Sequence, residues 1–287
     1  MPHLNATKFQ ALKKRHETRS VAQIEEHYEL ETALADRLRH SSQEERKRLY
    51  SESYDELFRR IPHHSQLTQS VDHRNLVHKQ VRVIRRFLRP EMRFAEIGAG
   101  DAWVPKLLAR ECAEAFALEV TDKAFDPTGA PSNFSFVLID GINLPLVDQS
   151  IDIFYSNQLM EHLHPDDALA QLAEIWRVLR PNGIYFCITP NRLAGPHDIS
   201  RYFDDEPHGF HLKEYSNGDL LRLFTRAGFS KIVSLFVGRG RYFGKVSPIV
   251  LEAIESSMMV LPTTLRQAIT STRPFRLLLG VKMLAYK

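Results

Sequence analysis

The stretch MRFAEIGAGDAWVPKLLARECAEAFALEV, residues 92–120, decides the fold of this chain. A short apolar run, MRFAEI, is followed by a turn containing Gly98 and Gly100 and then by a segment near 103–111 that suits a helix. Glycine permits a tight turn and lets a ligand approach the backbone without a Cβ in the way. A second apolar run follows, so the pattern predicts a strand, a helix and a parallel strand.

The same alternation continues along the chain. It predicts an α/β fold in which a seven-stranded sheet is covered by helices on both faces. Helices are expected at 103–111, 166–179 and 217–228. The expected strands are MRFAEI (92–97), EAFALEV (114–120), FSFVLI (134–139), IDIFYS (151–156), GIYFCIT (183–189), FSKIVSLFV (229–237) and LLLGVKMLAYK (277–287).

Two further segments lie outside this pattern. Residues 1–71 are polar and helical in character, and Ser42 followed by Glu45 is a capping-box pattern. We predict an N-terminal helical cap over 1–71 and a main domain over 72–287. Within that domain, residues 238–276 form a predicted helical insert between the last two strands.

The charges around the glycine turn favour a cationic ligand. A dinucleotide fingerprint requires a third glycine where this chain has Trp103. A pyrophosphate also prefers a helix N-terminus without nearby anions, whereas Glu96 precedes this turn and Asp101 lies within it. S-adenosyl-L-methionine carries an ammonium and a sulfonium and no phosphate, so we expect it here in preference to NAD.

Carboxylates follow the next two strands at suitable places for a nucleoside. Glu119 and Asp122 lie 19 and 22 residues after Gly100, and either could accept the ribose hydroxyls, with Glu119 favoured. Asp140 follows the third strand, where it could accept a hydrogen bond from an adenine amino group. Asn157 ends the fourth strand, at the sheet edge where such folds bind ligands.

Three stretches together resemble the class I, Rossmann-like methyltransferases that use S-adenosyl-L-methionine, particularly the type 11 family. They are EIGAGDA (96–102), IDGINLPLVDQSIDIFYSNQLMEHL (139–163) and EIWRVLRPNGIYFCITPN (174–191). The chain departs from the family at Ala102, where the turn has a third glycine, and at Glu119, where Asp is commoner. The resemblance implies a methionine site over Glu96, Gly98, Ala99 and Gly100, a ribose site at Glu119, and an adenine site at Asp140, Gly141 and Ile142.

The resemblance implies methyl transfer, for which an oxygen acceptor needs a base and an amine needs only to arrive neutral. His162 and His211 are the candidate catalytic residues, although His162 could position groups and His211 could fix a loop. The loop 191–215 is expected to roof the pocket and to orient the acceptor through His197, Arg201, Tyr202 and Tyr215. No ligand spacing requires a metal, and we expect none.

Composition limits the compartment and the partners that we expect for this chain. Two cysteines outside any CxxC motif and the lack of a signal-peptide core favour a reducing, cytoplasmic setting. Residues 1–90 hold 18 Lys and Arg against 12 Asp and Glu, which indicates either a solvated surface or a face for an anionic partner. No recognised nucleic-acid module is present. The insert's apolar helix could pack on the first helices, line a lipid-like acceptor pocket or rest on a membrane surface.

We therefore expect a methyltransferase that acts on an oxygen or nitrogen of a small or medium acceptor: a specialised metabolite, a glycan or a lipid-like intermediate. A donor-binding protein without catalysis, an NAD-linked oxidoreductase and a nucleic-acid methyltransferase that uses the basic first segment remain as alternatives. The sequence does not indicate the oligomeric state.

Overall fold

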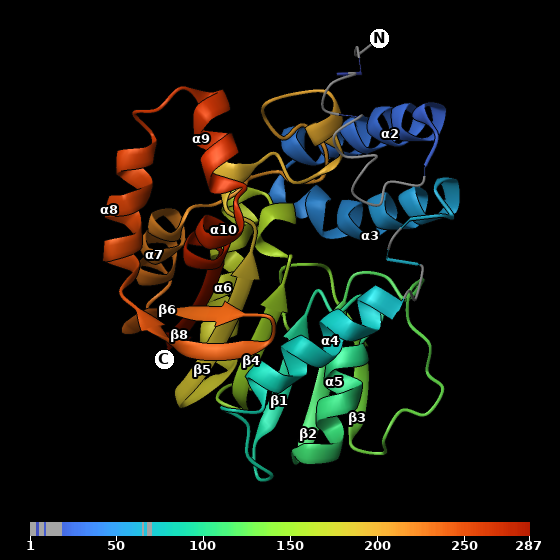
Figure 1. The fold of residues 1–287 in the computed structure, drawn as a ribbon. Coiled ribbons are helices and arrows are strands. Elements are labelled where there is room, and N and C mark those ends of the chain that lie inside the picture. The colour runs from blue at the N-terminus through green and yellow to red at the C-terminus, as the bar shows by residue number, and fades with distance from the viewer. Residues whose placement is uncertain (1–3, 6–8, 10–18, 65, 68–70) are drawn as a thin grey trace.

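The computed structural model describes residues 4–5, 9, 19–64, 66–67 and 71–287 (Figure 1). The rest of the predicted N-terminal cap lies outside the described residues. The boundary near residue 72 stays a prediction.

A single mixed sheet forms the centre of the molecule, with strand order β3-β2-β1-β4-β5-β8-β6-β7. The first five strands pair in parallel, β8 runs antiparallel to both β5 and β6, and β7 runs antiparallel to β6. The predicted α/β class is confirmed. The strands are β1 (Arg93–Ile97), β2 (Glu114–Glu119), β3 (Phe134–Leu138), β4 (Ile151–Asn157), β5 (Leu179–Thr189), β6 (Lys231–Gly238), β7 (Arg241–Val246) and β8 (Val281–Tyr286).

We predicted seven strands, whereas the described residues form eight. The additional strand, β7, lies within the segment predicted to be a helical insert. Gly238 pairs with Arg241, so β6 and β7 are joined by a two-residue turn. Its central residues, Arg239 and Gly240, have φ of 51° and 72°. Positive φ at both positions matches the right-handed twist of a hairpin, which is why the chain returns directly to the sheet.

Helices cover both faces of the sheet, as predicted. On one face α5 (Trp103–Leu108) packs over β1 and β2, and α4 (Val71–Ile84) packs on α5 and β7. On the other face α6 (Pro165–Val178) packs over β5 and α7 (Asn217–Arg226) over β6. Neighbouring strand residues alternate between two separate cores: Ala95 belongs to one and Phe94 to the other. This alternation explains why the strands read as nearly continuous apolar runs.

The helices of the insert lie at the end of the sheet that carries β6, where the first of them contacts α7 and the last contacts β6 (Figure 1). They are α8 (Pro248–Met258), α9 (Thr263–Thr270) and α10 (Arg273–Leu279). We expected the apolar helix of the insert to pack on the first helices of the chain; α8 instead packs on α7, with Leu251 buried. In the part of the chain that the structure describes, no helix combines the length and the apolar character needed to cross a bilayer.

Helices α2 (Val21–His40) and α3 (Gln43–Arg60) lie above the sheet edge where the parallel strands end (Figure 1). Both begin with a capping box, in which Ser20 pairs with Gln23 and Ser42 with Glu45. The capping box predicted at Ser42 is therefore confirmed. These reciprocal bonds satisfy backbone donors that a helix start would otherwise leave unpaired.

A buried ion pair fastens α3 to α6. Asp167 has no exposed surface, and its carboxylate lies 2.5 Å from Nε of Arg46 and 2.8 Å from Nη2. The Tyr50 hydroxyl and the Gln43 amide donate to the same carboxylate at 2.8 Å and 3.1 Å. Four donors from one helix thus converge on one acidic side chain of another, which fixes α3 over the strand ends.

Replacement of Asp167 by alanine should reduce the free energy of unfolding by about 3–5 kcal/mol, because it leaves the buried Arg46 guanidinium without its counter-charge. Urea denaturation followed by circular dichroism measures this loss. The matched control is Arg48→Ala, which removes an exposed pair with Glu52 on the same helix and should change stability by at most about 0.5 kcal/mol. Equal effects of the two substitutions would contradict the anchoring role of Asp167.

Candidate active site

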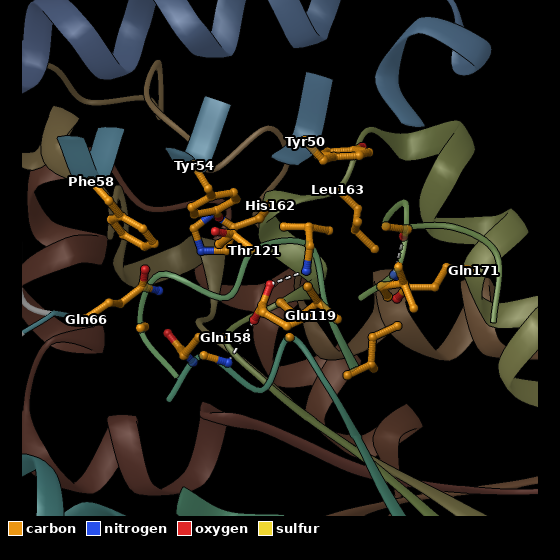
Figure 2. A pocket seen from close by; sticks show the side chains of 18 residues that line it. Tyr50, Tyr54, Phe58, Gln66, Glu119, Thr121, Gln158, His162, Leu163 and Gln171 are labelled. Carbon is orange, nitrogen blue, oxygen red and sulfur yellow. Dashed lines mark hydrogen bonds between the residues drawn. The ribbon is translucent and has the colours of Figure 1, made fainter. Parts of the chain in front are cut away.

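A cavity with about 710 Å³ of empty space, part of it open to solvent, lies where β1, β2, β3 and β4 end, beneath α3 (Figure 2). Ligands of open α/β sheets bind at this edge, so the cavity is the first candidate for the functional site. Its lining combines backbone glycines, aromatic rings, one carboxylate and several amide side chains. The lining residues are Tyr50, Tyr54, Phe58, Gln66, Ile97, Gly98, Gly100, Glu119, Val120, Thr121, Ala124, Ile139, Gly141, Gln158, Leu159, His162, Leu163 and Gln171.

The glycine turn after β1 forms the floor of the cavity. Gly98 has a φ of +68°, and a Cβ there would lie 2.9 Å from the side chain of Leu159. Gly100 has a φ of +53°, but a Cβ there would meet nothing within 4 Å. The first glycine is thus required by conformation and packing. The second faces open space that a bound ligand can use.

Glu119 lies at the centre of the cavity, where the end of β2 meets the glycine turn (Figure 2). Its two carboxylate oxygens accept hydrogen bonds from the backbone amides of Gly100 and Val120, each at 2.7 Å. These bonds fix the carboxylate in place and leave further lone pairs to accept from a ligand. Burial nevertheless raises the pKa of Glu119.

Two acidic side chains, Asp101 and Glu119, act on a third, Glu96, at this turn. Glu96 is 5% exposed, and its Oε2 has no hydrogen-bond partner among the residues that the structure describes. Burial raises the pKa of Glu96 well above its usual value, and the nearby charges of Asp101 and Glu119 raise it further. A cation would relieve this repulsion, whereas a phosphate would add to it.

Three aromatic residues of α3 cover the cavity from the side opposite the strands (Figure 2). Tyr50, Tyr54 and Phe58 are spaced four residues apart, so they lie on one face of the helix. Sequence reasoning missed them as site residues, although this spacing was visible. Apolar rings at the mouth can pack on a nucleoside and exclude water from it.

The loop after β3 approaches the cavity through its backbone. Gly141 lines the cavity, and a Cβ there would lie 2.9 Å from the Tyr50 ring. The Asp140 carboxylate, which does not line the cavity, accepts bonds from the backbone amides of Ile142 at 2.9 Å and Asn143 at 2.7 Å. Ile142 is buried beneath the loop. Asp140 therefore shapes the turn, and its predicted bond to adenine stays a prediction.

Some predicted donor-site residues do not line the cavity. Ala99 is buried in a small apolar cluster behind the turn, and Glu96 also lies behind the lining. Asn157 ends β4, but the next residue, Gln158, lines the cavity in its place. Gln158 has a φ of +58°, and this turn of the backbone directs the chain across the strand ends. Sequence spacing alone could not indicate that change of direction.

The two predicted catalytic histidines lie together at one side of the cavity. His162 lines it, and its ring centroid is 4.8 Å from that of His211, at a nearly perpendicular angle. Burial lowers the pKa of His162 to about 3 and that of His211 to about 4. Beside them, Glu161 is fully buried, and burial raises its pKa to about 8. Sequence reasoning did not include Glu161 in the site.

The four predicted acceptor-binding residues do not line this cavity. The His197 ring bonds to the backbone oxygen of Asn191 at 3.0 Å and borders a separate cavity of about 470 Å³ between the loop and the insert. Arg201 bonds to the Tyr202 hydroxyl at 3.1 Å, and Tyr202 is buried in the cluster that contains α2 residues. Tyr215 is buried in a core below the loop. Their assignment to the acceptor stays a prediction.

The known proteins that this chain resembles are described as methyltransferases. Residues 95–187 match a family model described as a methyltransferase domain. Over 97 residues the chain is 36% identical to a Mycolicibacterium smegmatis protein named "Probable S-adenosylmethionine-dependent methyltransferase", covering 34% of this chain and 35% of that protein. Over 137 residues it is 30% identical to Rv3030 of Mycobacterium tuberculosis, which carries the same description, covering 47% of each. The match thus spans less than half the length of either relative.

Solved structures agree on the fold. A SAM-dependent methyltransferase from Archaeoglobus fulgidus superposes with a TM-score of 0.50 at 18% identity, covering 75% of this chain and 94% of that chain. A chain from a Haloferax volcanii complex that contains the Trm112 methyltransferase activator gives 0.52 at 16% identity, covering 74% and 90%.

The fold resembles that of solved methyltransferases, and residues 95–187 match the methyltransferase-domain family. The predicted resemblance is confirmed.

Replacement of Glu119 by glutamine should weaken the binding of S-adenosylhomocysteine by roughly tenfold or more, because hydrogen bonds to a charged acceptor are worth about 1.5–3 kcal/mol. Isothermal titration calorimetry measures the affinity. Glu114→Gln is the matched control, because Glu114 lies at the other end of the same strand and pairs with Arg93. Unchanged affinity in the Glu119 variant would contradict the ribose assignment.

Proposed function

We propose that this protein is an S-adenosyl-L-methionine-dependent methyltransferase that acts on an oxygen or nitrogen of a small or medium acceptor. The observation that carries this proposal is the cavity above the glycine turn. Two backbone amides hold Glu119 there, and behind it Oε2 of the buried Glu96 has no hydrogen-bond partner among the described residues. This site has the charge and shape that a cationic sulfur nucleoside requires.

The cavity suggests one orientation for the donor. Glu119 would accept the ribose hydroxyls, and the open space above Gly100 would admit the methionine portion. The adenine would lie toward the loop at Asp140 and Gly141, between Ile139 and the Tyr50 ring. When bound, the donor would supply a methyl group on a positively charged sulfur. A lone pair of the acceptor would form the new bond to the methyl carbon while the carbon–sulfur bond breaks and its electrons stay on sulfur. The acceptor would then lose its proton.

The chain's own residues would mainly align and enclose the reactants. Alignment of two bound reactants alone can lower a barrier by several kcal/mol. Tyr54 and Phe58 would exclude water from the side that faces α3, and His162 lies beside Tyr54 with ring centroids 6.2 Å apart. The lowered pKa values of His162 and His211 make both imidazoles weak bases, so positioning is the stronger interpretation of their role.

The acceptor would enter beside α3, where Gln66 and Phe58 border the cavity. We expected the N-terminal cap, the 191–215 loop and the insert to enclose it together. Of these three segments, the cap contributes to the described lining and the other two do not. The loop reaches the site indirectly, because Phe210 packs on Tyr54 with ring centroids 5.1 Å apart.

A nucleic-acid acceptor is less well supported, because many basic residues of α2 and α3, and Arg85 just after α4, are already paired with acidic ones. Such pairing neutralises the charge that a phosphate backbone would need. The pairs are Arg37 with Glu52 and Glu56, Lys47 with Glu44, Arg48 with Glu52, Arg60 with Glu56 and Arg85 with Glu111.

The purified protein should bind S-adenosylhomocysteine with one site per chain and should show no binding of NAD under the same conditions, because the three carboxylates of the turn repel a pyrophosphate. Calorimetry with both ligands measures this preference. Incubation with methyl-labelled donor and candidate hydroxyl or amine acceptors then measures transfer. Preferred binding of NAD would overturn the proposal, and donor binding without transfer to any acceptor would favour the non-catalytic alternative.

A further inference from the structure

We infer that Glu161, His162 and His211 form a binding site for one divalent metal ion at the side of the donor cavity. One carboxylate oxygen and one ring nitrogen from each histidine lie within 4.8 Å of one another. This inference runs against the expectation of no metal. The residues come from two segments that are 49 positions apart, so sequence spacing could not reveal the cluster.

Two of the three ligand side chains carry polar atoms that lack hydrogen-bond partners. Glu161 is fully buried, yet its Oε1 has no partner among the residues that the structure describes. The same holds for Nδ1 of His162. An unpaired buried polar atom costs about 1–3 kcal/mol. Two such atoms beside a third ligand group therefore indicate that something binds between them.

Neighbouring side chains hold the ligands in place, as is usual at metal sites. The Thr189 hydroxyl donates to Oε2 of Glu161 at 2.8 Å, and Oε1 is the oxygen left over. Nδ1 of His211 lies 2.7 Å from the carboxylate of Glu214, which leaves Nε2 as the ligand atom. A carboxylate bonded to the far nitrogen of a histidine orients the ring and increases its basicity toward a metal.

Backbone contacts fasten the two segments to each other. The amide of Lys213 donates to the backbone oxygen of Glu161 at 3.1 Å. The amide of His197 donates to Glu214 at 2.6 Å, which fixes the carboxylate that orients His211. Arg39 of α2 donates to the backbone oxygen of Gly209 at 3.0 Å. These contacts therefore hold the loop so that His211 lies beside Glu161 and His162.

The chemistry of the ligands selects the ion. Two imidazole nitrogens and one carboxylate suit Zn²⁺, Mn²⁺ or Fe²⁺, whereas Mg²⁺ and Ca²⁺ prefer oxygen ligands alone. Ligand atoms in a tetrahedral zinc site lie roughly 3.3 Å apart, given metal–ligand distances of about 2.0–2.1 Å.

The position of the site suggests its use. His162 lines the donor cavity, so an open coordination position would face the space beside the methyl donor. An acceptor that carries a hydroxyl or other oxygen ligand could bind there and be held in line for transfer. This role rests on the proposed function, whereas metal binding itself does not.

Titration of the chelator-treated protein with Co²⁺ and Zn²⁺ tests the site. The full chain should show one equivalent of bound Co²⁺ with the visible absorption of an imidazole-ligated ion, and calorimetry should show one Zn²⁺ site. Glu161→Gln, His162→Gln and His211→Gln should each weaken Zn²⁺ binding by roughly tenfold or more. His78→Gln is the matched control, because His78 is exposed on α4, and it should retain the wild-type affinity.

Binding of S-adenosylhomocysteine is measured on every variant, so that loss of the fold is distinguished from loss of a ligand. Metal binding without nucleoside binding would refute the proposed function and leave this inference standing. Nucleoside binding in a wild-type protein that gives no Co²⁺ absorption would refute the inference, whatever the variants do. Equal Zn²⁺ affinity in the three variants and the control would also refute it.

Discussion

The site depends on electrostatic repulsion at a glycine turn. Asp101 and Glu119 lie near Glu96 where β1 and β2 end, and burial together with their charges makes Glu96 harder to ionise. The protein tolerates this cost because backbone amides hold Glu119 and because His73 bonds to Asp101 at 2.7 Å. A positively charged ligand would stabilise these carboxylates. The turn would therefore select its ligand by charge, in addition to any contact with the nucleoside.

The cap turns this charged edge into a cavity. Because Arg46 and Tyr50 both bind the buried Asp167, α3 is held with its aromatic face over the strand ends. Tyr50 serves twice, since its hydroxyl anchors the helix while its ring closes against Gly141. The stability of the cap and the shape of the nucleoside site are therefore coupled through one side chain.

Local patterns predicted most of the sheet and the floor of the site. The parallel strands β1, β2, β4 and β5 are largely buried and are recognisable as apolar runs, and the glycine turn carries its own signal. β7 was missed because its exposed and half-buried residues alternate over only six positions. The aromatic residues of α3 above the cavity and the cluster of Glu161, His162 and His211 were missed, because both depend on how distant segments pack. Asp140 shows a further limit, since the sequence could not indicate that its carboxylate would bond to its own loop.

The central claim is that the acidic turn binds a sulfur nucleoside. A crystal structure of the protein grown with S-adenosylhomocysteine tests it most directly. The account predicts the ligand in the cavity beneath α3, with its ribose hydroxyls on the Glu119 carboxylate and its amino acid portion above Gly100. A nucleoside bound elsewhere, or a ribose turned away from Glu119, would contradict it.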